Sequence, residues 1–270
     1  MSPAKTCRWR VNRGLALRTL GYVEAALSVL LGCTNLGADT EADRANTFRA
    51  VADTLAELGH LAMAGLSARH AMSIIEAGEL REQDIRRFGG VERMTQAVKA
   101  SIARVLLDQA EVAFDAELEV DRDDVAEAYE LVDGPSPLED GSRPALIMSM
   151  LRATALKHLD DEEGAERLYR EALGIAKESG DTYAEGHALA FLGVLFRQHG
   201  RAEEGAGYLL AAAQIARDAG RVDDEFYALF HAYRADRPDL LGMCDELYPT
   251  TRARTPAVIA YEREILGQTA

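Results

Sequence analysis

The sequence is poor in the residues that β-structure favours. Aromatic residues make up 6% of its 270 residues and there are only 7 prolines. Nowhere do valine, isoleucine, threonine and aromatic residues alternate with polar ones over the length of a strand. Alanine and leucine dominate instead, and both favour helix. The composition therefore predicts an all-α protein.

Cysteine is also scarce, and long apolar runs are absent. The three cysteines, Cys7, Cys33 and Cys244, are widely separated and odd in number, which excludes a disulfide framework and any metal-ligand spacing. The N-terminal residues lack the apolar core of a signal peptide, and no apolar stretch reaches the roughly 18 residues of a membrane span. We therefore expect a cytoplasmic protein that does not bind membranes.

Motifs that carry catalysis are missing as well. The six histidines form no pair at metal-ligand spacing on a helix, and no serine lies in a Gly-x-Ser-x-Gly elbow. The glycine-rich stretches lack the Lys-Ser/Thr of a phosphate-binding loop. Residues 121–124, Asp-Arg-Asp-Asp, are read as a helix start, because a calcium loop also needs a glycine and a distal glutamate. We expect no metal, no cofactor and no enzymatic activity.

Positive charge is in deficit. The net charge of −15 disfavours direct nucleic-acid binding, which needs clustered lysine and arginine. The charge is also uneven: residues 1–20 carry five bases and no acid, whereas residues 108–140 carry thirteen acids against the single base Arg122. We favour a solvated face for this acidic stretch. The alternative is a surface for a basic partner, including the N-terminus of a second copy in a homo-oligomer.

What the sequence does contain is an internal repeat. Residues 181–220 read as two amphipathic helices hinged at Gly200, with small residues where the helices would approach each other. The same six-position pattern, at intervals of +3, +4, +5, +4 and +3, occurs three times. It comprises Gly193, Phe196, Gly200, Gly205, Leu209 and Ala212; near the N-terminus Gly14, Leu17, Gly21, Ala26, Leu30 and Cys33; and between them Ala52, Leu55, Gly59, Ala64, Ala68 and Ala71. Cys33 therefore fills a small-residue position of the core, and we expect it to be packed rather than reactive.

The rest of the chain supplies further units. Thr40 caps a predicted helix pair over 41–58 and 61–77. A further unit lies forty residues before the 181–220 unit and repeats the pattern of that unit. Residues 79–143 fit the repeat pattern poorly. We favour a degenerate repeat with a long helix over 91–118, and the alternative is a linker between the two repeat blocks. Residues 257–267 predict a terminal capping helix.

This pattern resembles the tetratricopeptide repeat, in its form with long helices and units of roughly 40 residues. The resemblance covers nearly the whole chain, although Arg152-Ala153 replaces the Leu-Gly pair in one unit. It implies a right-handed α-solenoid of about five to six antiparallel helical hairpins, in one domain over 1–270. The expected N-terminal block spans about 4–78, the irregular segment about 79–143 and the C-terminal block about 144–270.

In the tetratricopeptide family the first helix of each unit lines a concave groove, so the resemblance also suggests ligand-contacting positions. Their basic character favours an acidic peptide or a carboxylate-bearing ligand over a scatter of solvated side chains. The candidates are Arg8, Asn12, Arg18, Asn46, Arg49, Lys157, His158, His187, Phe191, Arg197, Gln198, Tyr227, His231 and Arg234. Arg8 and Asn12 look like half of the family's carboxylate clamp, but Ala50 stands where the matching asparagine is needed. The single tryptophan, Trp9, is expected to be a buried residue of the end repeat.

The sequence thus favours a non-enzymatic scaffold that binds a protein or peptide. The alternative is a regulatory sensor that binds a signalling peptide or small molecule and acts through a partner, because no basic recognition helix for DNA is present. An enzyme that uses the groove as a pocket is the third hypothesis.

Overall fold

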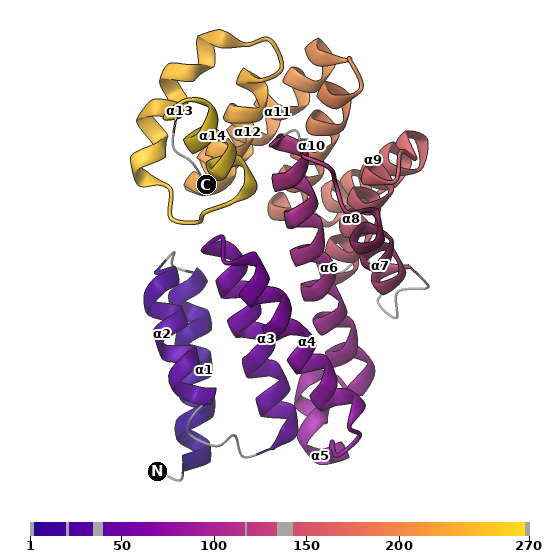
Figure 1. Ribbon diagram of the computed structural model, residues 1–270, viewed down its shortest axis with the longest axis vertical. Coiled ribbons are helices and arrows are strands. Elements are labelled where there is room, and N and C mark those ends of the chain that lie inside the picture. The colour runs from indigo at the N-terminus through magenta and orange to yellow at the C-terminus, as the bar shows by residue number, and fades with distance from the viewer. Residues whose placement is uncertain (1–2, 20–21, 35–39, 117, 134–142, 268–270) are drawn as a thin grey trace. The chain divides into compact units, whose positions relative to one another are not determined.

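The computed structural model describes residues 3–19, 22–34, 40–116, 118–133 and 143–267, and within this part the chain forms helices and turns without strands. The chain divides into two compact units, unit 1 over Met1–Asp108 and unit 2 over Gln109–Ala270. Figure 1 colours unit 1 from indigo to magenta and unit 2 from magenta to yellow. The all-α prediction is confirmed.

Unit 1 contains two helix pairs followed by a short element and most of a long helix. The first pair is α1 (Pro3–Thr19) with α2 (Val23–Thr34), and the second is α3 (Glu41–Glu57) with α4 (Leu61–Glu76). The helices of each pair pack along each other, as Figure 1 shows. The chain continues through α5 (Glu82–Ile85) and the 3-10 helix η1 (Arg86–Phe88) into α6 (Val91–Asp115), whose last residues belong to unit 2.

Unit 2 continues the pairing. After α7 (Arg122–Val132), α8 (Arg143–His158) packs with α9 (Glu162–Ser179), and α10 (Thr182–Gln198) packs with α11 (Ala202–Asp218). The remaining elements are α12 (Val222–Tyr233), η2 (Pro238–Leu240), α13 (Leu241–Leu247), η3 (Tyr248–Thr250) and α14 (Pro256–Glu264). The terminal helix α14 packs on α12, as a capping helix does.

Several helix starts are set by side chains that accept hydrogen bonds from first-turn amides. Thr40 caps α3 through the amide of Asp43 at 3.2 Å. Asp181 caps α10 through Tyr183 and Ala184, both at 3.1 Å. Such caps satisfy donors that a helix start would otherwise leave unpaired. Residues 121–124 begin α7 in the same way, which confirms that the Asp-Arg-Asp-Asp sequence is a helix start.

One turn recurs between paired helices. In α10–α11 the amide of Arg201 donates to the carbonyl of Phe196 at 2.8 Å across Gly200, whose φ is 77°. The position forty residues earlier holds Asp160 at φ 65°, in a turn closed by the same type of bond. The left-handed conformation suits glycine and strains most other residues. Asp160 is therefore a non-glycine residue at a position where the equivalent residue of the next repeat is glycine.

Close approach of helices explains the small residues of the repeat. A Cβ atom at Gly193 would lie 2.5 Å from Cγ of Leu209 and 2.8 Å from the carbonyl oxygen of Gly205. At Gly14, the equivalent position in unit 1, it would lie 2.7 Å from Cγ of Leu30. Cys33 is 1% exposed, as its place in the pattern predicts.

The expectation for Trp9 is wrong. Its side chain is 55% exposed, with the guanidinium carbon of Arg13 5.5 Å from the ring centroid. Among residues 9–19 of α1, the part whose side chains the structure describes, Val11 and Gly14 are buried, so the core side there does not include Trp9. A side chain two residues from a buried position points in another direction on a helix, which accounts for the exposure.

Candidate ligand-binding face

The candidates of unit 2 lie on the first helices of successive pairs, α8, α10 and α12, or directly after them. We call this surface the first-helix face. It holds Lys157 and His158 at the end of α8, residues from His187 to Gln198 on α10, and Tyr227, His231 and Arg234 at α12. Several of these side chains contact the last turns of α6, so residues distant in sequence meet here.

Glu111 of α6 is the partner of the two basic residues that end α8. Its Oε1 accepts a hydrogen bond from Nζ of Lys157 and lies 3.2 Å from Nε2 of His158. The side chains of Lys157 and His158 are 5% and 3% exposed. Burial alone would raise the pKa of Glu111, but Lys157 and His158 outweigh it and hold this pKa well below its usual range. Glu111 is therefore ionised, and its charge is matched at the site.

Asp115, one helical turn further on, is the partner of Arg234. Its side chain is 3% exposed, and Oδ1 accepts a hydrogen bond from Nη1 of Arg234. Arg263 of α14 donates to the backbone carbonyl of Asp115. Arg234 also lies 3.5 Å from Glu264. Two basic side chains thus surround the C-terminal end of α6, where carbonyl groups and the helix dipole favour positive charge.

Aromatic rings form a continuous row across α10 and α12. The row runs Tyr183, His187, Phe191, Tyr227 and His231, with successive centroids 4.4, 5.9, 6.4 and 4.5 Å apart. Such edge and tilted contacts are the favourable arrangements of aromatic pairs. The row gives the first-helix face an apolar strip beside its charged residues.

Arg197 is a basic residue of this face with side-chain nitrogens that lack a hydrogen-bond partner among the described residues. Its Nε and Nη2 are shielded from solvent and have no hydrogen-bond partner in the described part of the chain. Burial and the nearby Arg234 lower the pKa of Arg197, while Asp115 and Glu111 oppose this shift. Within the same ranges, Nε2 of Gln198 and Nδ1 of His231 are also buried without a partner. Burial, Arg197 and Arg234 hold the pKa of His231 well below its usual value, so this histidine is neutral near pH 7.

In unit 1, Arg18 of α1 and Arg49 of α3 both contact Asp53, a buried acid of α3. Nη1 of Arg49 lies 2.9 Å, and Nη1 of Arg18 3.2 Å, from Oδ2 of Asp53. Ser101 of α6 donates to Oδ1 of Asp53 at 2.7 Å, and Arg49 also donates to Asn46 at 3.1 Å. Burial would raise the pKa of Asp53, but the two arginines and Ser101 outweigh it and lower this pKa. The charges here are balanced locally.

The remaining two candidates lie in α1. Asn12 is exposed, and the side chain of Arg8 lies outside the described residues. The clamp suggested by Arg8 and Asn12 therefore stays a prediction.

Solved structures with a similar arrangement are helical-repeat proteins. A Rap protein in complex with the competence and sporulation factor has a TM-score of 0.57 at 12% identity, over 92% of this chain and 76% of that one. BtubC from P. vanneervenii has a TM-score of 0.52 at 15% identity, over 93% of this chain and 92% of that one. This chain has a tetratricopeptide-like helical-repeat fold.

A third structure has the same fold in a longer protein. It is a signal transduction ATPase with numerous domains, carrying a tetratricopeptide repeat sensor, from Pyrococcus horikoshii; its TM-score is 0.53 at 14% identity. The match covers 93% of this chain but 37% of the ATPase. No protein-family model and no curated protein matches the chain. The α-solenoid prediction is confirmed at the level of the fold.

Two acidic residues that contact the first-helix face escaped the sequence reasoning. Glu111 and Asp115 belong to the stretch 108–140, for which a solvated face was favoured, yet both lie among basic residues. Their spacing of four residues, which places both carboxylates on one side of a helix, was the available signal. Nothing local in the sequence pairs them with Lys157 and Arg234, because these contacts span 46 and 119 residues.

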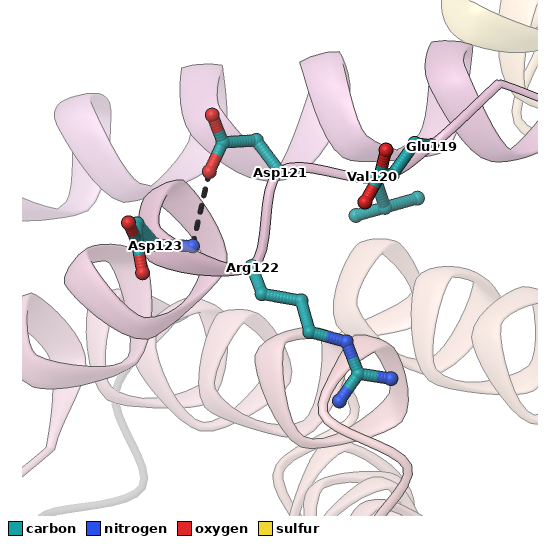
Figure 2. Close-up of a pocket in the computed structure, with 5 residues that line it drawn as sticks. All are labelled: Glu119, Val120, Asp121, Arg122 and Asp123. Atoms are coloured by element: carbon teal, nitrogen blue, oxygen red, sulfur yellow. Dashed lines mark hydrogen bonds between the residues drawn. The ribbon is translucent and has the colours of Figure 1, made fainter.

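Residues 119–123 of the acidic stretch fit the solvated description. They line an open hollow of about 380 Å³, and Figure 2 shows how their side chains lie. Asp121 turns back to accept a hydrogen bond from the amide of Asp123 at 3.0 Å, while Arg122 extends away and pairs with Asp160 at 2.6 Å. The helix start and an exposed ion pair account for these side chains.

None of the helices in the described ranges combines the length and apolar character of a bilayer span.

Proposed function

We propose that this tetratricopeptide-like chain is a non-enzymatic scaffold that binds an acidic peptide or protein segment on the first-helix face of unit 2. The observation that carries the proposal is that Nε and Nη2 of Arg197 have no hydrogen-bond partner among the described residues. A partner that opened access to these two buried atoms could place a carboxylate to accept a hydrogen bond from each.

The local balance of charge supports Arg197 as the anchor. Lys157 is paired with Glu111, and Arg234 with Asp115. A cation shielded from water without a partner is costly, so a carboxylate that pairs with Arg197 removes this cost. The buried amide nitrogen of Gln198 could donate a further hydrogen bond to a ligand, and Nδ1 of His231 could donate or accept one according to its tautomer.

The aromatic row supports a peptide as the ligand. Phe191 and Tyr227 provide apolar surface beside Arg197, so a segment with a carboxylate flanked by apolar side chains matches both features. The Rap protein with a similar fold was solved with a factor bound, which agrees with a binding role. The ATPase with a repeat sensor favours the alternative, in which ligand binding on the same face is a signal passed to a partner.

The test is selection on an array of random dodecapeptides with Arg197→Gln. The wild-type protein should select peptides rich in aspartate and glutamate, and the variant should lose at least about tenfold in affinity, since a charged hydrogen bond contributes roughly 1.5–3 kcal/mol. Arg122→Gln is the matched control, because it removes the same charge from an exposed pair in the same unit. Equal selection by wild type and Arg197→Gln would refute Arg197 as the anchor.

We further propose that the exposed acids of 108–140 form a second surface, which would take a basic partner, including residues 1–20 of another copy. Association of this kind depends on salt. A homo-oligomer that dissociates at high ionic strength in sedimentation would support it, and a monomer at low ionic strength would exclude it. The small number of cysteines favours the expected cytoplasmic location.

A further inference from the structure

The C-terminal end of α6 presents to the first-helix face the chemistry proposed for the acidic partner. Glu111 and Asp115 are four residues apart, so their carboxylates project from one side of the helix. Both carboxylates contact basic residues of that face: Glu111 contacts Lys157 and His158, and Asp115 contacts Arg234. A segment of the chain itself thus occupies positions predicted for a ligand.

Polar contacts supply much of what holds this end of α6 on the face. Phe114 is 43% exposed, and it touches the face through an edge contact with His158 at 6.2 Å between ring centroids. Val112 and Ala113 are only half-buried, whereas Ala110 is buried. The polar contacts of the segment include the ion pairs of Glu111 and Asp115 and the bond from Arg263 to the helix end. Another acidic segment can supply the same kind of contact.

The fit of α6 on the face is also incomplete. Oδ2 of Asp115 is buried without a hydrogen-bond partner in the described ranges, and Arg197 remains unpaired beside it. Burial of a carboxylate oxygen without a partner costs free energy. A segment with two carboxylates, one of them shared between Arg234 and Arg197 and the other on Lys157, would therefore satisfy one more base than α6 does.

We propose that residues 109–115 are an internal ligand of the first-helix face, and that an acidic partner binds fully by displacing them. The proposal rests on the proposed function and specifies its partner: a segment with two carboxylates one helical turn apart. The internal ligand weakens binding of every acidic segment that does not displace it, because Lys157 and Arg234 are unavailable while α6 is in place.

The test uses a fluorescein-labelled, alanine-rich helical peptide with two glutamates four residues apart. The double variant Glu111→Gln/Asp115→Asn should bind this peptide about tenfold tighter than wild type, because two basic groups become available. The control Glu119→Gln/Glu130→Gln changes the net charge by the same amount at two exposed residues of the acidic stretch. An isomeric peptide with glutamates two residues apart should lose most of the increase, since its carboxylates point to different sides.

Each outcome decides the proposal. If the double variant binds no tighter than the control, or if neither binds, residues 109–115 are not an internal ligand. If the double variant binds tighter but Arg197→Gln changes nothing in either background, the internal ligand stands and Arg197 as the anchor fails. If Arg197→Gln weakens binding to wild type while the double variant shows no increase, the proposed function stands and the displacement does not occur.

The wild-type protein offers a second measurement that needs no variant, should the double variant unfold. Amide hydrogen exchange of residues 109–115 should accelerate several-fold when the four-residue-spaced peptide saturates the protein, because displaced amides lose protection. Amides of α11, away from the face, should keep their rates. Unchanged exchange in 109–115 at saturation would overturn the displacement.

Discussion

Gly193→Ala should destabilise unit 2, although alanine is the better helix former. The added Cβ would meet Cγ of Leu209 at 2.5 Å and the carbonyl oxygen of Gly205 at 2.8 Å. Leu209 can rotate, but the carbonyl belongs to the backbone of α11, so the two helices must separate. Overpacking of this kind costs roughly 1–3 kcal/mol, and replacing an interior helical glycine returns about 0.8–1 kcal/mol. We expect a net loss of up to about 2 kcal/mol.

The assay is urea unfolding followed by circular dichroism, with Gly207→Ala as the matched control. Gly207 lies within α11 with no atom within 4 Å of its ideal Cβ position, so this substitution adds helix propensity without a clash. It should stabilise the protein by about 0.8–1 kcal/mol. The two substitutions are chemically identical, so opposite signs isolate the close approach of α10 and α11. A Gly193→Ala variant as stable as Gly207→Ala would refute the reasoning.

Three further outcomes follow from single residues. Asp160→Gly should stabilise unit 2 by about 0.5–1 kcal/mol in urea unfolding, because glycine relieves the positive φ at the cost of one exposed ion pair; Asp160→Asn should not. Because the pKa of Glu111 is lowered in the folded protein, this residue stabilises the fold at pH values above its ordinary pKa of 4.5. The contribution is lost as the pH falls through the pKa of the folded state. Unfolding between pH 3 and 7 should therefore depend less on pH in Glu111→Gln, and an unchanged profile would contradict the pairing. Burial raises the pKa of Cys244 to about 12, so an aromatic disulfide reagent should modify it only after unfolding.

Local patterns in the sequence predicted the helix pairs well. Gly193 and Leu209 stand at fixed spacing within one repeat, and the same spacing recurs at Gly14 and Leu30, so repetition showed which positions face each other. Thr40 could be recognised because a cap acts on amides within three residues of itself. These features depend on neighbours in the chain or on the repeat, and both are visible in sequence.

The residues that contact one another on the first-helix face were harder to predict, because these contacts join elements that are distant in the sequence. The first-helix positions could be named from the resemblance, but the acids opposite them come from α6, which fits the repeat pattern poorly. Glu111 reaches Lys157 and Asp115 reaches Arg234, and no periodicity relates these positions. The exposure of Trp9 was missed for a related reason, since a single large aromatic residue does not show which side of its helix faces the core.

The local pairing of charge changes how the first helices can attract a partner. Summed along the sequence, Arg18, Arg49, Lys157 and Arg234 suggested a basic surface that would attract acidic segments from a distance. The first two pair with Asp53, and the others with Glu111 and Asp115, so their fields are largely cancelled at short range. Affinity should then depend on the two-donor geometry of Arg197, which acts only on contact. Selectivity for a carboxylate is expected to come from the dissociation rate, with association only weakly dependent on salt.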